Sequence, residues 1–348
     1  QPSVQGGLID AGRRDARGAI RLWLMGPFAL VAVMLAVGGL TRLTDSGLSI
    51  TEWKPVTGAI PPMSEAEWQS EFDKYQQIPE FRIQNAWMDL ADFKSIYWWE
   101  WGHRFLARLI GFVVAIPLLF FWISGRLADW LKPALLLLLA MGALQGFIGW
   151  WMVKSGLVDR VDVSQIRLAV HLTMACVIFT FTIWLARSIA PHSPDGAPEF
   201  KGRAGLLVLL ILVQTFMGGL VAGLDAGMAF NSWPLMNGAF VPEGLLAIQP
   251  VWKNFFDNAM TVQFVHRLTA YVLWAFVLYH AVSLQRARPH SHHARRGWMI
   301  FALVSIQALL GILTLVMQDG ETLLEHLQQD SDLARQLLDA GGEPAVLK

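Results

Sequence analysis

The chain has 348 residues, of which 54% are hydrophobic and 16% charged, with 27 basic and 27 acidic side chains. Soluble domains carry roughly a quarter charged residues. Here the charge is missing from whole runs of about 20 residues, the length that a helix needs to cross a bilayer. The composition excludes a soluble enzyme and a disordered chain, and the single cysteine excludes a disulfide scaffold. Zero net charge argues against a nucleic-acid partner.

Seven apolar runs predict membrane-spanning helices. In chain order they are 22–40, 103–123, 134–153, 166–186, 204–222, 261–284 and 297–317. Lys and Arg concentrate in the N-terminal arm and in alternate short loops, which places these parts in the cytoplasm of a bacterium, with the chain in the inner membrane. In a eukaryote they would face the mitochondrial matrix. The long connections 41–102 and 223–260 then lie outside.

Residues 319–348 depart from this pattern. Leucines at helical spacing indicate an amphipathic helix, but Asp330, Asp332 and Arg335 would be costly inside lipid. We expect a polar tail in place of an eighth span.

An internal repeat relates the two halves of the chain. When the chain is aligned with itself, GGLTRLTDSGLSITEWKPVTGAIPP (38–62) falls without a gap on GGLVAGLDAGMAFNSWPLMNGAFVP (218–242), with nine identities in 25 positions. Further along, the pair His103-Arg104 matches His266-Arg267, and Gln145 matches Gln307. The sequence therefore predicts an all-α integral membrane protein of two tandem four-helix repeats, over 20–190 and 200–318, with the eighth helix in doubt.

Three histidines lie at similar depth, near the outer ends of the inward-running helices. His103 and His171 belong to the first repeat, and His266 to the second. Any one of them alone could be a packing residue, but three at related positions indicate a site, because ionisable groups inside spans usually line one. Neutral imidazole is a ligand of haem iron, and two helices of a bundle can offer one each. His326, in the polar tail, is the candidate for a second iron ligand beside His266, although its flanking residues are polar.

Charged residues accompany these histidines. Glu100 precedes His103 by three positions among tryptophans, which suits a proton-handling carboxyl, although a carboxylate at a helix start is the alternative. Arg104, Arg108 and Arg267 could pair with haem propionates, or could reach to lipid headgroups.

Several strings together resemble one family. EWGHR before an apolar helix, the block 38–62, QIRLAVHLTMA, and FNSWPLMNGAFVPEG followed by VQFVHR are similar to haem A synthase of the alphaproteobacterial and mitochondrial type, over about residues 20–318. The resemblance implies eight helices in two four-helix halves. It also implies an oxidoreductase that converts the C8 methyl of haem O to the formyl group of haem A for cytochrome oxidase assembly.

The resemblance also implies roles for particular residues. His103 and His171 would bracket the site where haem O reacts, and Glu100 would match the family's functional glutamate. His266 would bind a haem b, and His326 stands at about the offset of its family partner, although the apolar helix expected after it is missing. The expected partners are haem O, haem O synthase, an electron donor and membrane lipid, with self-association left open.

Two other functions fit the same pattern. A non-enzymatic di-haem b electron carrier would show b-type spectra but form no formyl product. A transporter with a histidine proton relay would show no Soret band, and ligand positions near one interface, not at the midplane, weigh against it.

Overall fold

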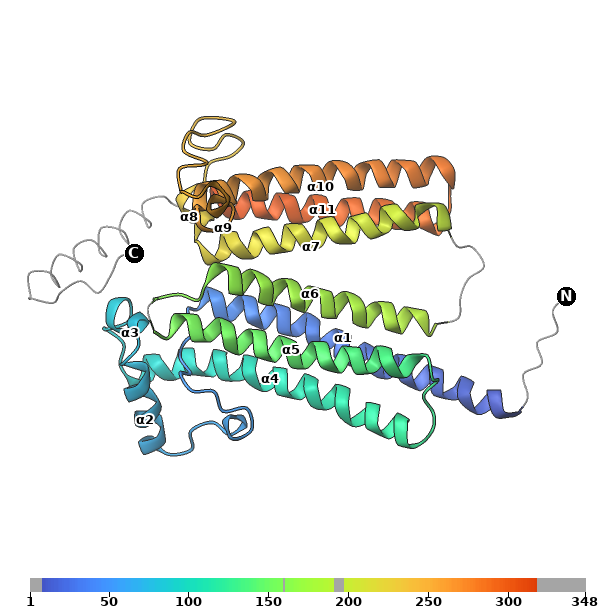
Figure 1. The fold of residues 1–348 in the computed structure, drawn as a ribbon, viewed down its shortest axis with the longest axis horizontal. Helices are drawn as coiled ribbons and strands as arrows, with labels where there is room; N and C mark the ends of the chain where they lie inside the picture. The colour runs from blue at the N-terminus through green and yellow to red at the C-terminus, as the bar shows by residue number, and fades with distance from the viewer. Residues whose placement is uncertain (1–7, 159, 191–196, 318–348) are drawn as a thin grey trace, which may run out of the picture. The chain divides into compact units, whose positions relative to one another are not determined.

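The computed structural model describes residues 8–158, 160–190 and 197–317 (Figure 1). These residues form helices joined by turns and loops, and no β-strand element occurs among them. The chain divides into two compact units, unit 1 from Gln1 to Pro194 and unit 2 from Asp195 to Lys348. The assignment of one haem-related site to each half stays a prediction, and the tail at 319–348 with His326 lies outside the described residues.

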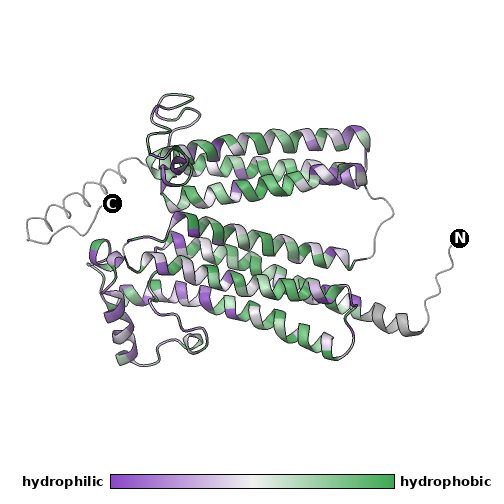
Figure 2. Cartoon of the chain, in the orientation of Figure 1, coloured by the Kyte–Doolittle hydropathy of each residue, from purple (hydrophilic) through white to green (hydrophobic). Residues whose placement is uncertain are grey.

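Seven helices in the described part are long and apolar enough to span a membrane, which confirms an all-α multi-pass protein. They are α1 (Leu8–Leu43), α4 (Leu90–Ile123), α5 (Leu131–Gly156), α6 (Gln165–Ser188), α7 (Lys201–Gly223), α10 (Ala259–Ala287) and α11 (His292–Val316). Figure 2 shows apolar residues along these helices and polar residues on the short helix α2 (Glu65–Tyr75). Each long helix pairs its own backbone groups, as lipid requires.

Two helices begin well before their predicted starts, α1 at Leu8 and α4 at Leu90, and the start of α4 bears on the site. The apolar run predicted a start at 103, but the helix begins at Leu90. The Asp89 side chain accepts hydrogen bonds from the backbone N–H groups of Ala91 and Asp92, and the Asp92 side chain accepts one from the Asp89 N–H. This capping box stabilises a polar first turn that hydropathy alone does not detect. Glu100 is therefore not at a helix start, which removes that alternative for it.

Unit 1 contains a four-helix bundle. Helix α1 packs against α4 and α6, and α5 packs against α6 and α4, so that α4 and α6 stand at opposite corners. An apolar core cluster joins the helices, with Leu24, Leu135 and Leu185 fully buried. Two histidine-bearing helices that are not neighbours can thus present side chains to the same interior.

The connection between α1 and α4 builds a small folded insertion. It contains α2 and α3 (Pro79–Ile83) and packs on the first turns of α4 through an aromatic core that includes Phe72, Tyr75 and Phe93. Ser64 begins α2 with a capping box to Glu67. The expected outer loop is therefore an ordered element and fixes the chain that precedes Glu100.

Unit 2 is built around α10, which packs against α7 and α11. Its apolar core includes Leu207, Leu273 and Val277. The loop between α7 and α10 carries two short helices, α8 (Ala226–Ala229) and α9 (Asn254–Asp257). Asn254 is fully buried and donates through Nδ2 to the carbonyls of Ile248 and Val251, which joins α9 to the chain that precedes it.

Candidate functional site

Each of the three predicted histidines faces a glycine of a neighbouring helix. A Cβ atom built on Gly38 of α1 would lie 3.4 Å from His103 Nε2. One built on Gly149 of α5 would lie 3.0 Å from His171 Cε1, and one on Gly218 of α7 would lie 3.4 Å from His266 Cε1. At Gly38 and Gly218 the added atom would be in ordinary van der Waals contact with the ring, whereas at Gly149 the His171 ring would have to shift.

These contacts follow the internal repeat. Gly38 and Gly218 are the first residues of the two aligned blocks, and His103 and His266 are the matched histidines. The structure therefore places the same glycine opposite the same histidine in both units. A resemblance seen only in the sequence thus corresponds to one duplicated contact.

Glutamines adjoin two of the histidines. Gln145 Nε2 donates to the His171 carbonyl at 3.0 Å and lies 3.4 Å from its Nε2. Gln214 Nε2 lies 3.2 Å from both ring nitrogens of His266, and Gln214 Oε1 accepts from Thr269. Sequence analysis noted Gln145 only as a repeat marker and missed Gln214. A glutamine inside an apolar run was the available signal, since a polar side chain in a span needs a partner.

Glu100 is buried, with 3% of its surface exposed, and accepts three short hydrogen bonds. Ser49 Oγ and the Ile50 N–H donate to Oε2 at 2.7 and 2.6 Å, and Arg104 Nη2 donates to Oε1 at 2.6 Å. All of these partners are donors, which is the arrangement that an ionised carboxylate requires. Its oxygens therefore join α4 to the end of the loop after α1.

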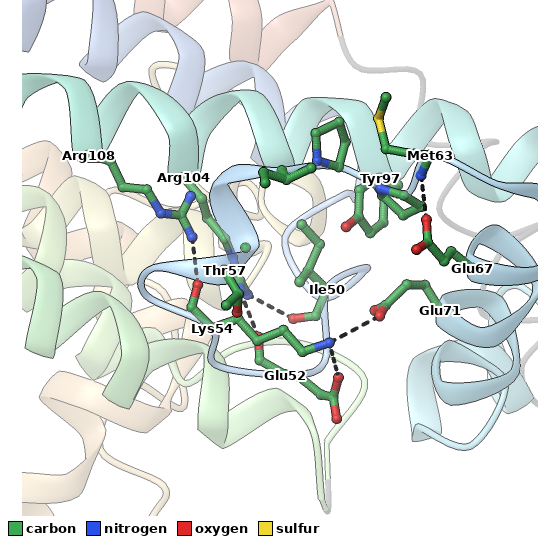
Figure 3. A pocket seen from close by; sticks show the side chains of 14 residues that line it. Ile50, Glu52, Lys54, Thr57, Met63, Glu67, Glu71, Tyr97, Arg104 and Arg108 are labelled. Atoms are coloured by element: carbon green, nitrogen blue, oxygen red, sulfur yellow. Dashed lines mark hydrogen bonds and ion pairs between the residues drawn. The ribbon is translucent and has the colours of Figure 1, made fainter.

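Arg104 and Arg108 hold that loop through its backbone (Figure 3). Arg104 donates to the carbonyls of Ile50 and Glu52, and Arg108 donates to those of Lys54 and Pro55. The sequence analysis left two roles open for both arginines, pairing with haem propionates or reaching to lipid headgroups. In the structure their donors are largely engaged by protein, although Arg108 Nη1 is buried without a partner.

A cavity of about 310 Å³ lies beside this loop. Its lining includes Arg104, Arg108 and Lys54 together with acidic residues of α2, which Figure 3 shows around it. Lys54 pairs with Glu52 at 2.6 Å and with Glu71 at 3.3 Å. Hydrogen bonds from Lys54 and then Lys74 lower the pKa of Glu52 below its usual range. The ion pairs connect the loop to α2 and leave the cavity with mixed charge.

The donors of unit 1 fit a haem. His103 and His171 come from opposite corners of one bundle, and each ring lies against a glycine of a neighbouring helix. His171 Nδ1 is buried without a hydrogen-bond partner. Neutral imidazoles offered from two helices are the usual axial ligands of b-type haem iron.

Of the two haem ligands predicted for unit 2, one lies among the described residues, His266. The neighbouring Arg267 donates through Nη2 to the Phe230 carbonyl at 2.7 Å, while its Nε and Nη1 are buried without partners. The proposed second ligand, His326, lies outside the described residues.

The cytochrome oxidase assembly protein family (COX15-CtaA) matches residues 21–319. The chain belongs to this family. Three relatives, each named "Heme A synthase", come from Chelativorans sp., Mesorhizobium japonicum and Agrobacterium fabrum. The chain is 58% identical to the first over 311 residues, 54% to the second over 303 and 55% to the third over 313. No solved structure matches the chain.

These alignments span most of this chain and most of each of the three relatives. They cover 87–89% of this chain and 84–86% of the three relatives. The whole region with both histidine-bearing units is therefore shared, which confirms the family resemblance found in the sequence.

Proposed function

We propose that the chain is a haem A synthase, an oxidoreductase that converts the C8 methyl of haem O to a formyl group and so provides haem A for cytochrome oxidase. The observation that carries this is the identity of 54–58% over nearly nine-tenths of the chain to relatives of that name. The multi-pass fold places the reaction in a membrane, and we assign it to the bacterial inner membrane with the N-terminus in the cytoplasm.

In this proposal unit 1 is the reaction site. His103 and His171 would hold haem O by its iron, and Gly149 leaves the His171 ring room that a Cβ atom would take. Glu100, fixed by Ser49 and Arg104, would hold or move a proton near the outer end of α4. The haem would supply the oxidative chemistry, and the protein would bind and orient it.

In unit 2, His266 would bind a resident haem b, which would supply one-electron transfer from an external donor. Gln214 lies beside both ring nitrogens and can fix the ring orientation. His326 is the proposed second ligand. In the repeat, α11 of unit 2 corresponds to α5 of unit 1. Gln145 and Gly149 of α5 lie against His171, whereas the matching Gln307 and Gly311 of α11 are exposed. Haem O synthase is the expected supplier of substrate.

Product analysis tests the reaction. The chain is co-expressed with a haem O source, and extracted pigments are identified by mass. We expect haem A from the native chain and unconverted haem O from His103→Ala or His171→Ala, because either change removes an iron ligand. Stable b-type spectra with no haem A from the native chain would instead identify a di-haem electron carrier.

Retention of full conversion by both variants would contradict the assignment of unit 1. Gln69→Ala on the exposed side of α2 is a control for expression and insertion, because the Gln69 side chain donates to Asp73 within the same short helix. Its haem A yield should equal that of the native chain.

A further inference from the structure

The two units differ at one buried position beside their matched histidines. The repeat that pairs His103-Arg104 with His266-Arg267 also pairs Glu100 with Gln263, three positions earlier in each case. Gln263 is 3% exposed, as Glu100 is. A buried carboxylate in unit 1 therefore corresponds to a buried, uncharged amide of nearly the same size in unit 2.

The arginine beside this position makes one contact that is the same in the two units. Arg104 Nη2 donates to the Ile50 carbonyl at 2.8 Å, and Arg267 Nη2 donates to the Phe230 carbonyl at 2.7 Å. Ile50 and Phe230 occupy the same place in the two aligned blocks of the repeat. The arginines thus make the same loop contact, and the difference between the units lies in what else each guanidinium meets.

In unit 1 the guanidinium is neutralised. Glu100 Oε1 accepts from Arg104 Nη2 at 2.6 Å, and Ser49 Oγ donates to the other carboxylate oxygen. In unit 2 both of these partners are replaced, Glu100 by Gln263 and Ser49 by Ala229. Unit 2 thus lacks both the carboxylate and the hydroxyl that donates to it, which is the pattern expected if no carboxylate is needed at this position.

The consequence is a set of buried polar atoms without partners. Gln263 Oε1 and both Nε and Nη1 of Arg267 make no hydrogen bond in the described structure. Leaving a buried donor without a hydrogen bond costs free energy, and the cost is greater when the donor is charged. Three such atoms next to a predicted ligand histidine indicate a position completed by a bound group. A guanidinium with free N–H groups selects an anion, and a carboxylate fits its geometry best.

We propose that Gln263 is the specificity-determining residue of unit 2: by leaving Arg267 without a counter-charge, it makes that arginine the receptor for a carboxylate of the bound ligand. Glu100 denies Arg104 the same role. The inference deepens the proposed function, since the ligand carboxylate would be a haem propionate. Gln263 acts through Arg267 and is a positioning residue, not a catalytic one.

The test separates charge recognition from general damage. The full-length chain carrying His103→Ala and His171→Ala, so that only unit 2 binds, is prepared free of haem and titrated in detergent with haem b and with its dimethyl ester. Both have the same iron and ring, but only haem b has free carboxylates. The Soret absorbance gives the two dissociation constants.

We expect the parent to bind haem b at least about tenfold more tightly than the diester, equivalent to about 1.4 kcal/mol. Gln263→Glu should form the ion pair that Arg104 makes with Glu100 and reduce this preference to below about threefold. Gln263→Met, which is uncharged and of similar length, should keep the preference. A merely structural role would weaken both ligands equally in either variant.

Two results would overturn the inference. One is a Gln263→Glu variant that still prefers haem b as strongly as its parent does, and the other is a parent with no preference between haem and diester. If the parent binds neither ligand, the haem b site proposed for unit 2 fails as well. The same titration on a His266→Ala background, comparing Glu100 with Glu100→Gln, gives the reciprocal result: release of Arg104 should raise the carboxylate preference of unit 1.

Discussion

A glycine opposite each histidine is the feature that most directly constrains single residues. Gly149 is the tightest of the three, because a Cβ atom there would lie 3.0 Å from His171 Cε1 and the ring would have to move by a few tenths of an ångström. A ligand moved from its position loses alignment with the iron, and small misplacements cost large factors in rate.

We therefore expect Gly149→Ala to lower haem A formation by about tenfold or more and to alter the Soret band of bound haem. Pigment extraction and absorbance spectra would measure both. The matched control is Gly146→Ala on the same helix, where an added Cβ meets nothing within 4 Å. Both changes gain similar helix propensity, so equal activity in the two variants would contradict the role of the Gly149 contact.

At the residue scale the sequence predicts the histidines, Glu100 and the arginines as candidate site residues, but it does not show what they contact. Depth and repetition mark a histidine, whereas the acceptors of Arg104 and Arg108 are backbone carbonyls, which leave no trace in the residue types. Gln263 was also missed. Its signal was available, because extending the repeat by three positions from His266 reaches it.

At the scale of elements, the insertion of α2 and α3 contains a buried carboxyl whose hydrogen-bonding neighbours, among the described residues, are uncharged. Glu80 is 3% exposed and lies beside Tyr75 and Asn85, with Oε2 unpartnered. Burial, and then the nearby negative charge of Glu100, raise the pKa of Glu80 to about 9. The Glu80 side chain is thus protonated at neutral pH in the folded insertion.

This shift makes the insertion sensitive to alkali. Below the ordinary pKa of 4.5 the carboxyl is neutral in both the folded and the unfolded chain, and stability is complete. As pH rises from there to about 9, only the unfolded chain loses the proton, so the free energy of unfolding falls by up to about 1.4 kcal/mol per pH unit. Glu80→Gln should remove this slope.

Thermal unfolding in detergent between pH 5 and 9 would measure the effect. We expect the native Tm to fall relative to that of Glu80→Gln as pH rises. Glu65→Gln, which removes an exposed carboxylate from the same insertion, should track the native chain. Parallel curves for the native chain and Glu80→Gln would show that Glu80 does not carry the dependence.

The long helices were predictable from apolar run length alone, and the described spans agree with the predicted ones apart from their ends. The insertion was not, since its helices are short and amphipathic and depend on aromatic packing among Phe72, Tyr75 and Phe93. For the same reason α4 was predicted too short, with a start at 103 and not at Leu90. Hydropathy detects helices that lipid surrounds, and it misses helices that are stabilised by packing against other parts of the protein.

At the scale of the whole molecule, the two units have separate cores and separate histidine–glycine contacts. Changes at sites that share no partners usually act additively. We expect the haem signals of the two units to be separable for that reason.

Replacing both His103 and His171 should remove one haem per chain and leave the signal of unit 2 unchanged, while His266→Ala should do the converse. Reduced-minus-oxidised spectra with haem quantitation per chain would show this. The two difference spectra should sum to that of the native protein. Loss of all haem from either variant would mean that the units cannot load independently.

The hydrogen bonds from Arg104 and Arg108 to the loop after α1 determine which sequence changes that loop can accept. All four loop acceptors are main-chain oxygens, of Ile50, Glu52, Lys54 and Pro55. Every amino acid brings such an oxygen, so these four contacts can survive changes of side chain in the loop, whereas replacing either arginine removes two of them.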